Sequence, residues 1–248
     1  MQIVDLSLRV RRAETPFFRS LNRAVSILLT ARLPMPAILR TICCAMYTLH
    51  FAARQLSRRA YMFFYGEPLF RSRCETFGAD CFVCALPEIN GHTRIHVGDR
   101  VSFWGDLGIT SGRTYDVPTL ILQDRAQIGH RVAIVVNREV VIEKGAMISN
   151  NCYISDSDSH PKDSDRRYNS QAPSDADIKP VRICRNAWVG VDCTIYKGVT
   201  VGEGAIIGAR SVVISDVPPF AIAMGNPARV LASARASAER VIPVPEKP

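Results

Sequence analysis

The sequence predicts a parallel β-helical solenoid that follows an N-terminal helical segment. From Ile183 onward, branched aliphatic residues recur every six positions, and a small residue stands four positions after each of them. The aliphatic positions are Ile183, Val189, Ile195, Val201, Ile207 and Val213, and the small positions are Ala187, Cys193, Val199, Ala205, Ser211 and Val217. A six-residue repeat is typical of a β-helix in which each unit is one short strand and a turn. An α-helix repeats every 3.6 residues and an ordinary strand every two, so neither explains the pattern.

The repeat continues upstream in a weaker form. The aliphatic-to-small spacing is kept by Val97 and Val101, Ile128 and Val132, Ile142 and Ala146, and Ile148 and Cys152. Two charged residues, Arg138 and Asp158, stand at small positions. A charge that breaks a structural rule marks a candidate functional position, because something other than packing must account for it. The alternative is that the coil ends there and a loop begins.

The N-terminal segment, 1–75, has the pattern of helices. Leu21–Leu33 and Ala37–Tyr65 carry apolar residues at three- and four-residue spacing, and Pro34 and Pro36 separate the two segments. We therefore expect a basic helical extension over residues 1–75, a β-helix over 76–232 with a loop at 160–179, and a tail over 233–248.

The net charge of +8 belongs to the helical extension. Residues 1–75 hold twelve arginines and four acidic residues, whereas the rest of the chain is neutral overall. An arginine-rich amphipathic helix suits the anionic inner face of a cell membrane. The alternative is that the helices pack on the solenoid or on a neighbouring subunit. Because no recognition motif accompanies the charge, no nucleic acid partner is expected.

The other compositional features favour a protein of the cytoplasm. The longest uncharged run of the extension, Thr41–Ala53, is shorter than the about 20 residues that span a bilayer. The eight cysteines do not form the pattern of a disulfide framework, which favours a reducing compartment. Cys81 and Cys84 have the spacing of metal ligands, but no second pair completes a site, and no metal is expected.

A polar interruption separates Ile154 from Ile183 and contains one histidine, His160. A solenoid accommodates such an insertion as a loop at one corner, so the rigid coils would position the imidazole. An imidazole is the usual group for taking a proton from a hydroxyl or an amine near neutral pH. A surface loop with an incidental histidine is the alternative.

The run from His160 to Val230 resembles the hexapeptide-repeat acyltransferases of the maltose and galactoside O-acetyltransferase type. The matching segments are His160-Pro161-x-Asp163, Lys179-Pro180-Val181-x-Ile183, Asn186-Ala187-Trp188-Val189-Gly190, Lys197-Gly198-Val199-Thr200-Val201-Gly202, Asp216-Val217-Pro218-Pro219 and Gly225-Asn226-Pro227-Ala228-Arg229-Val230. Residues 67–74 are also similar to the lead-in of a bacterial branch linked to surface-polysaccharide decoration. The resemblance implies a left-handed parallel β-helix, a homotrimer with sites between subunits, and acetyl-CoA as the acyl donor.

The resemblance also implies roles for individual residues. His160 would deprotonate the acceptor hydroxyl, which then attacks the thioester in a ternary complex. Independently of the resemblance, Asp156 and Asp158 are predicted on the substrate side, where either could orient the imidazole as an acid does in a triad. The alternative is a carboxylate that satisfies backbone amides of the loop. The predicted donor-binding residues are Trp188, Gly190, Gly208, Ala209, Arg210 and Arg229, although a tryptophan in a repeat also fits a core position.

The acceptor side departs from the family. The asparagine-rich turn that contacts sugar in the family aligns near Gly129–Arg131, which leaves His130 and Arg131 as the expected acceptor contacts. The sequence therefore predicts O-acetylation of a sugar or glycan precursor, in surface polysaccharide or glycan biosynthesis. N-acetylation of an amino sugar and a non-catalytic scaffold stay open as alternatives. A zinc enzyme using His92, His96 and His130 is disfavoured, because their spacing differs from that of the γ-class carbonic anhydrases.

Overall fold

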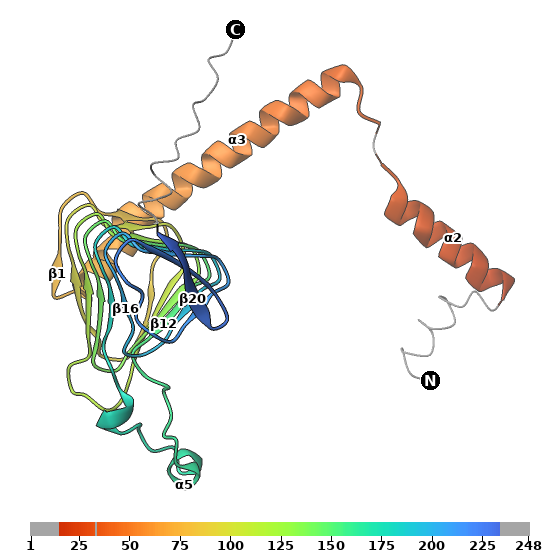
Figure 1. Ribbon diagram of the computed structural model, residues 1–248. Helices are drawn as coiled ribbons and strands as arrows, with labels where there is room; N and C mark the ends of the chain where they lie inside the picture. The colour runs from red at the N-terminus through yellow and green to blue at the C-terminus, as the bar shows by residue number, and fades with distance from the viewer. Residues whose placement is uncertain (1–14, 33, 234–248) are drawn as a thin grey trace. The chain divides into compact units, whose positions relative to one another are not determined.

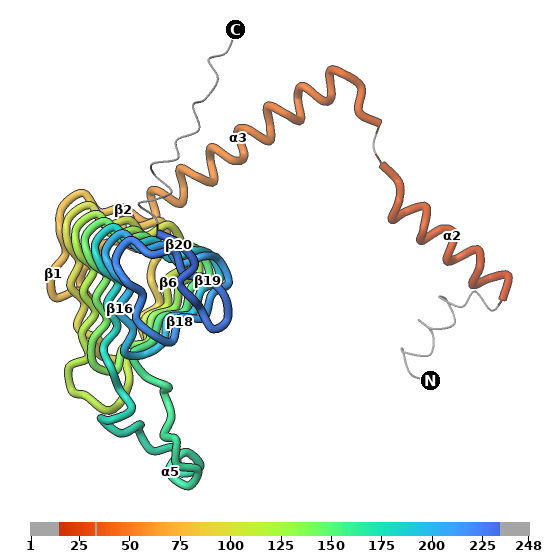
Figure 2. Tube along the Cα trace, viewed as in Figure 1, coloured from red at the N-terminus to blue at the C-terminus, as the bar shows by residue number. Residues whose placement is uncertain are grey.

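The computed structural model describes residues 15–32 and 34–233. The chain divides into two compact units, residues 1–55 and 56–248, and each is described here by itself. The second unit is a left-handed parallel β-helix built from three sheets, whose coils are seen stacked in Figures 1 and 2. The predicted fold class is confirmed.

Successive strands pass to the three sheets in turn, so that each sheet receives every third strand of the repeat. Sheet A contains β1 (Thr76–Phe77), β4 (Arg94–Val97), β7 (Thr119–Leu122), β10 (Glu139–Ile142), β13 (Val181–Ile183) and β16 (Thr200–Val201). Sheet B contains β2 (Phe82–Val83), β5 (Ser102–Phe103), β8 (Gln127–Ile128), β11 (Met147–Ile148), β14 (Trp188–Val189), β17 (Ile206–Ile207), β19 (Ala221–Gly225) and β20 (Ala228–Ser233). Sheet C contains β3 (Glu88–Asn90), β6 (Leu107–Ser111), β9 (Val132–Val136), β12 (Tyr153–Ser155), β15 (Thr194–Ile195) and β18 (Val212–Val213).

The core is a column of aliphatic side chains inside the coils. All six predicted aliphatic positions from Ile183 to Val213 are buried, and so are all six small positions from Ala187 to Val217. In-register pairing explains the column, since Ile183 lies beside Val201 and Val189 beside Ile207 in the neighbouring coil. Each coil therefore buries its apolar residues against the coil before it and the coil after it.

At two of the three corners, several coils turn through a non-glycine residue with left-handed backbone conformation. Between sheets B and C these residues are Arg131, Asn151, Asp192 and Arg210, with φ between 54° and 60°. Between sheets A and B they include Asp80, Arg100, Arg125 and Asn186, with φ between 55° and 59°. Asparagine and aspartate tolerate this conformation better than other side chains do, whereas the arginines are held in it by the stacked coils.

Within the second unit, a helical segment at residues 56–72 covers the first coil. Helix α3 (Ala37–Tyr61) continues through a π-helix (Met62–Gly66) into α4 (Glu67–Ser72). Phe70 of α4 is buried and packs edge-on against Phe77 and Phe103, at ring-centroid distances of 5.7 and 5.3 Å. Arg58 donates to the carbonyl of Cys84 at 3.0 Å. The lead-in segment thus closes the open end of the solenoid, which otherwise would expose its apolar core.

The N-terminal unit is helical, as predicted. Helix α2 (Pro16–Thr30) begins at Thr15, whose hydroxyl accepts a hydrogen bond from the amide of Phe18. It starts earlier and ends earlier than the predicted Leu21–Leu33, and Leu33 lies outside the described residues. Neither α2 nor α3 contains a buried residue. Among the described residues, no helix has both the length and the apolar character needed to span a bilayer.

The structure divides the chain at Gln55, inside α3, whereas the sequence-based boundary at residue 75 falls directly before β1. The last strand, β20, ends at Ser233, and residues 234–248 of the expected tail lie outside the described residues.

Replacing Phe70 by alanine should lower the free energy of unfolding by about 3–5 kcal/mol, because it leaves a cavity between two aromatic rings at the end of the core. Chemical denaturation followed by circular dichroism measures the change. Phe64→Ala is the matched control, since Phe64 is exposed in the preceding π-helix. Equal losses in the two variants would contradict the capping role of Phe70.

Candidate functional site

The polar interruption forms a projecting loop between β12 of sheet C and β13 of sheet A (Figures 1 and 2). It contains the short helix α5 (Ser164–Tyr168), which Asp163 caps by accepting from the amide of Arg166 at 2.8 Å. A 3₁₀ turn at Asp175–Asp177 leads back to the solenoid. His160 lies exposed at the start of this loop, shortly after Asp158.

Both ends of the loop are tied to the next coil by Lys197. The Lys197 ammonium donates to Asp158 Oδ2 at 2.5 Å and to the backbone carbonyl of Asp177 at 2.8 Å. Lys197 is largely buried in this position, which strengthens charge-assisted bonds relative to those at the surface. Since Asp158 precedes His160 and Asp177 ends the loop, a single side chain fixes the loop at its entry and its exit.

The carboxylate of Asp177 has two further partners. It accepts from the Ser174 hydroxyl at 2.7 Å and forms an ion pair with Lys162 at 3.1 Å. The Ser174 hydrogen bond, followed by the Lys162 interaction, lowers the pKa of Asp177. The segment between β6 and β7 supports the loop as well, because Thr114 Oγ1 donates to the carbonyl of Pro173 at 3.1 Å.

Asp156 holds the preceding coil together. Its carboxylate is fully buried and accepts from the backbone amides of Asn137, Arg138 and Glu139 at 2.7, 2.6 and 2.9 Å. Burial raises the pKa of Asp156, and the hydrogen bonds to the ionised form oppose that rise. Asp156 therefore satisfies backbone amides of the turn after β9, which is the alternative that the sequence left open beside a contact with substrate.

His130 and Arg131 lie at a different corner, between sheets B and C. The Nδ1 atom of His130 accepts from the amide of Asp106 at 3.2 Å, so the neutral imidazole carries its hydrogen on Nε2. The ring lies over Gly105, where an added Cβ would stand 1.6 Å from Nδ1. Gly105 therefore makes room for the histidine, and about half of the His130 side chain stays exposed.

Residues 180–215 match the bacterial transferase hexapeptide family, which is described by six repeats. The β-helix with its six-residue repeat, the hexapeptide-repeat domain of this chain, is similar to that family over β13 to β18. A putative acetyltransferase of Staphylococcus aureus is 48% identical over 52 residues, which are 21% of this chain and 26% of that protein. A probable acetyltransferase of Mycobacterium tuberculosis is 27% identical over 145 residues, which are 58% of this chain and 44% of that protein. The chain thus spans less than half the length of these relatives.

A solved structure extends the likeness in fold to a larger part of the chain. It is a variant of AntD, an N-acyltransferase from Bacillus cereus, in complex with dTDP and coenzyme A. The TM-score is 0.53 at 18% identity, over 71% of this chain and 93% of that chain. At this identity the likeness concerns the fold.

The predicted donor-binding residues follow the corner between sheets B and C. Trp188 stands on the outer face of β14 with 46% of its surface exposed, and its indole N–H donates to Ser149 Oγ at 3.1 Å. It is therefore not a core residue of the hexapeptide-repeat domain. The Arg210 side chain is 85% exposed and forms a long ion pair with Asp192, at 3.7 Å. Arg229 extends from β20 in an exposed position.

The two glycines of this group have a packing role. A Cβ on Gly190 would stand 2.7 Å from the carbonyl oxygen of Ile207, and a Cβ on Gly208 would stand 2.7 Å from the Cβ of Met224. Their small size is thus required by the next coil, independently of any ligand. The neighbouring Ala209 is exposed and follows Gly208 on the corner.

The predicted site residues lie at two corners of the chain. His160, Asp156 and Asp158 belong to the corner between sheets C and A, whereas His130, Arg131, Gly190 and the Gly208–Arg210 turn belong to the corner between sheets B and C. One strand of sheet C with its flanking residues separates them, a span of about 15 Å. His92 and His96 lie elsewhere, in contact with Ser111 and Thr76 respectively.

Sequence reasoning did not find the anchoring role of Lys197 or the contact of Ser149 with Trp188. In the sequence Lys197 stands out only as part of a repeat segment. Its partners are 20 and 39 residues away along the chain, so no local pattern connects them.

Replacing Asp156 by asparagine should lower the free energy of unfolding by about 2–4 kcal/mol, because an amide cannot accept all the buried N–H groups that the carboxylate accepts. Thermal unfolding measures the loss. Asp175→Asn is the control, since Asp175 is exposed in the 3₁₀ turn. Two variants of equal stability would mean that Asp156 does not hold the turn.

Lys197→Met should loosen the loop without unfolding the solenoid. We expect tryptic cleavage after the exposed Arg166 and Arg167 to become about fivefold faster or more, since local opening governs proteolysis. Lys144→Met is the matched control, because Lys144 forms a 3.9 Å ion pair with Asp124 away from the loop. Cleavage at the wild-type rate in Lys197→Met would show that other contacts hold the loop.

Proposed function

We propose that this chain is an acetyl-CoA-dependent O-acetyltransferase that acts on a sugar hydroxyl, with His160 as general base. The observation that carries the proposal is the position of His160 in a hexapeptide-repeat domain. Its imidazole is exposed to solvent, yet the chain on both sides of it is fixed by Asp158 and Asp177 through Lys197. A base must be both accessible to the substrate and held in place.

The proposed reaction is a direct transfer. The imidazole of His160 takes the proton of the acceptor hydroxyl as its oxygen attacks the acetyl carbonyl. The new C–O bond forms, the C–S bond breaks, and the imidazolium returns the proton to the thiolate that leaves. In this scheme Asp158 acts as a positioning residue, because its carboxylate is engaged by Lys197 at 2.5 Å.

Exposed groups at the corner between sheets B and C support donor binding. Arg210 and Arg229 offer guanidinium groups that complement phosphate, and Trp188 offers an apolar surface beside them. The donor supplies an activated acetyl thioester. Coenzyme A accompanies AntD in its solved structure, which makes acetyl-CoA the first donor to test.

The distance between the two corners favours a homotrimer. Within one subunit about 15 Å of sheet C separates His160 from the donor-binding corner. We propose that the His160 corner of one subunit meets the donor-binding corner of another, with His130 and Arg131 contacting the acceptor. Tyr153 and Trp188 are exposed on the flanking sheets and would supply apolar surface to such an interface.

The proposed acceptor is a sugar or glycan precursor in bacterial surface-polysaccharide or glycan biosynthesis in the cytoplasm. An amine acceptor is the second candidate, because AntD is an N-acyltransferase and one of its variants was solved with dTDP-4-amino-4,6-dideoxyglucose. The same base serves both reactions, so the acceptor decides between them.

The test is the release of coenzyme A from acetyl-CoA with a panel of sugars, nucleotide-sugars, amino sugars and oligosaccharides. We expect acceptor-dependent release that falls by about 10²–10⁴ in His160→Ala, since this is what a general base contributes. Binding of acetyl-CoA, measured by calorimetry, should stay unchanged in the variant.

His96→Ala is the matched control, because His96 lies on sheet A away from both corners. Wild-type turnover in His160→Ala would remove the proposed base. No release with any acceptor, together with no binding of acetyl-CoA, would favour the non-catalytic scaffold.

A further inference from the structure

We infer that α2 and the first part of α3 form a docking surface for an anionic lipid membrane, on which they lie parallel to the surface. This inference goes beyond the proposed function and does not depend on it. It rests on the exposed apolar faces of these helices, on their shared spacing and on the charge of the segment.

The apolar face of α2 has no partner within the described residues of its unit. Phe17, Leu21, Val25 and Leu28 follow one another at i, i+4, i+8 and i+11, which places them on one side of the helix. All four are exposed, with Leu28 at 77%. The opposite side carries Arg19 and Arg23 together with polar side chains.

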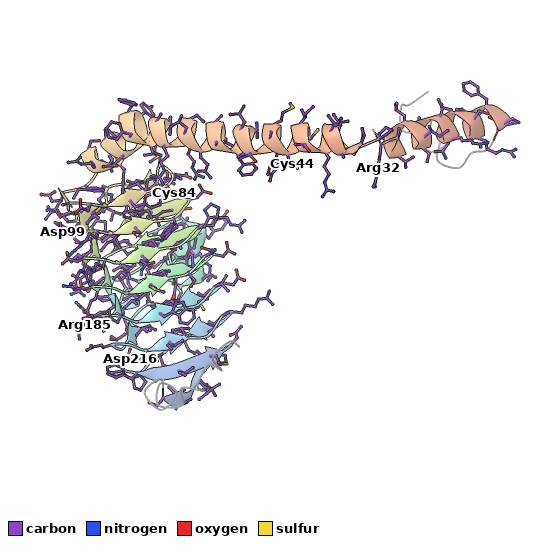
Figure 3. All side chains as sticks on the ribbon, turned by 90° about the horizontal axis from the view of Figure 1, so that it is seen from above. Arg32, Cys44, Cys84, Asp99, Arg185 and Asp216 are labelled. Carbon is purple, nitrogen blue, oxygen red and sulfur yellow. The ribbon has the colours of Figure 1, made fainter. Side chains whose placement is uncertain are left out.

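The first part of α3 repeats the arrangement. Ile38, Ile42, Met46 and Leu49 have the same i, i+4, i+8 and i+11 spacing, and Ile38 is 79% exposed. Arg40 stands at i+2 from the first apolar residue, as Arg19 does in α2. Figure 3 shows side chains standing out from both helices, with Arg32 and Cys44 labelled. Because α2 and the first part of α3 share the same apolar spacing, we expect both helices to dock on the same kind of surface.

The positive charge of the helical segment favours an anionic lipid membrane over a second copy of the chain as the docking partner. From Thr15 to Gly66 the sequence contains seven arginines and no acidic residue. Helices that paired with a second copy of themselves would bring like charges together, with no acidic partner at the flanks of the contact. The rest of the chain from residue 76 is neutral overall and offers no excess of negative charge. An anionic lipid surface supplies both the apolar layer and the negative charge.

Arginine and aromatic side chains suit the region between lipid headgroups and acyl chains. The guanidinium group binds phosphate in a bidentate manner, and its apolar stem lies along the helix surface. Phe17 is exposed and adds an aromatic ring to the apolar face of α2. The expected geometry has the apolar faces of α2 and α3 about 5–10 Å into the headgroup boundary.

The experiment is sedimentation of the full chain with vesicles of phosphatidylcholine that contain about 30 mol% phosphatidylserine, beside vesicles of phosphatidylcholine alone. We expect binding to the anionic vesicles that weakens about tenfold when salt is raised from about 0.1 M to about 0.5 M. Arg19→Gln with Arg23→Gln should weaken the binding by about tenfold as well.

The apolar face is tested by Leu21→Gln with Leu28→Gln, since glutamine keeps helix propensity. We expect partitioning to fall by about tenfold or more. The matched control is Asn22→Gln with Ser26→Gln on the polar face of the same helix, which should bind as the wild type does. Release of coenzyme A should be equal in all these variants, so this test and that of His160 are read separately.

Three outcomes would overturn the inference. The first is no sedimentation of the full chain with anionic vesicles at low salt. The second is equal binding to neutral and anionic vesicles. The third is a lower oligomer mass in Leu21→Gln with Leu28→Gln, measured by light scattering, with unchanged vesicle binding, because a second copy would then cover the face.

Discussion

Every coil of the β-helix must return the backbone to the same three sheets in register with the coil before it. Equivalent positions in successive coils are occupied by Phe77, Val97, Leu122, Ile142, Ile183 and Val201. The length of chain between neighbours in this series varies widely, from the shortest coil at Ile183–Val201 to the longest at Ile142–Ile183. The hydrogen-bond ladder is nevertheless continuous across all of them. Because strand positions are fixed, additional residues can leave the solenoid only at a corner.

This constraint explains why the site is built with buried polar groups. The longest coil interrupts the solenoid between Ser155 and Val181, and its two ends must still enter the corner in register. Asp156 secures the coil below by binding three consecutive backbone amides, and Lys197 secures the loop from the coil above. Asp156 and Lys197 thus bind backbone groups that the insertion would otherwise leave without a hydrogen bond. These contacts hold the two ends of the loop in place, and His160 lies exposed between them.

The same variation in coil length determines how much of the fold and of the candidate site could be predicted from the sequence. A coil made of three successive hexapeptides places its three strands at a strict six-residue period. The repeat is therefore plain in the sequence from Ile183 to Val217. It is weak before Ile183, because the coils there are longer than three hexapeptides. His160 could be predicted as a candidate because its signal is local. The roles of Asp156 and Lys197 could not, since their partners come from other coils. The outward position of Trp188 follows from the strand register, in which Val189 takes the buried place.

The rigidity of the ladder also bears on how the proposed chemistry is assembled. A hinge that moved His160 toward the donor-binding corner would have to break the strands of sheet C, which pair in parallel from β3 to β18. These strand pairs hold the aliphatic side chains of the core in place, so breaking them would expose those side chains to water. Bringing another subunit to the corner leaves every coil intact. For a fold of this kind, association of rigid subunits is thus a less costly way to complete a site than deformation within one subunit.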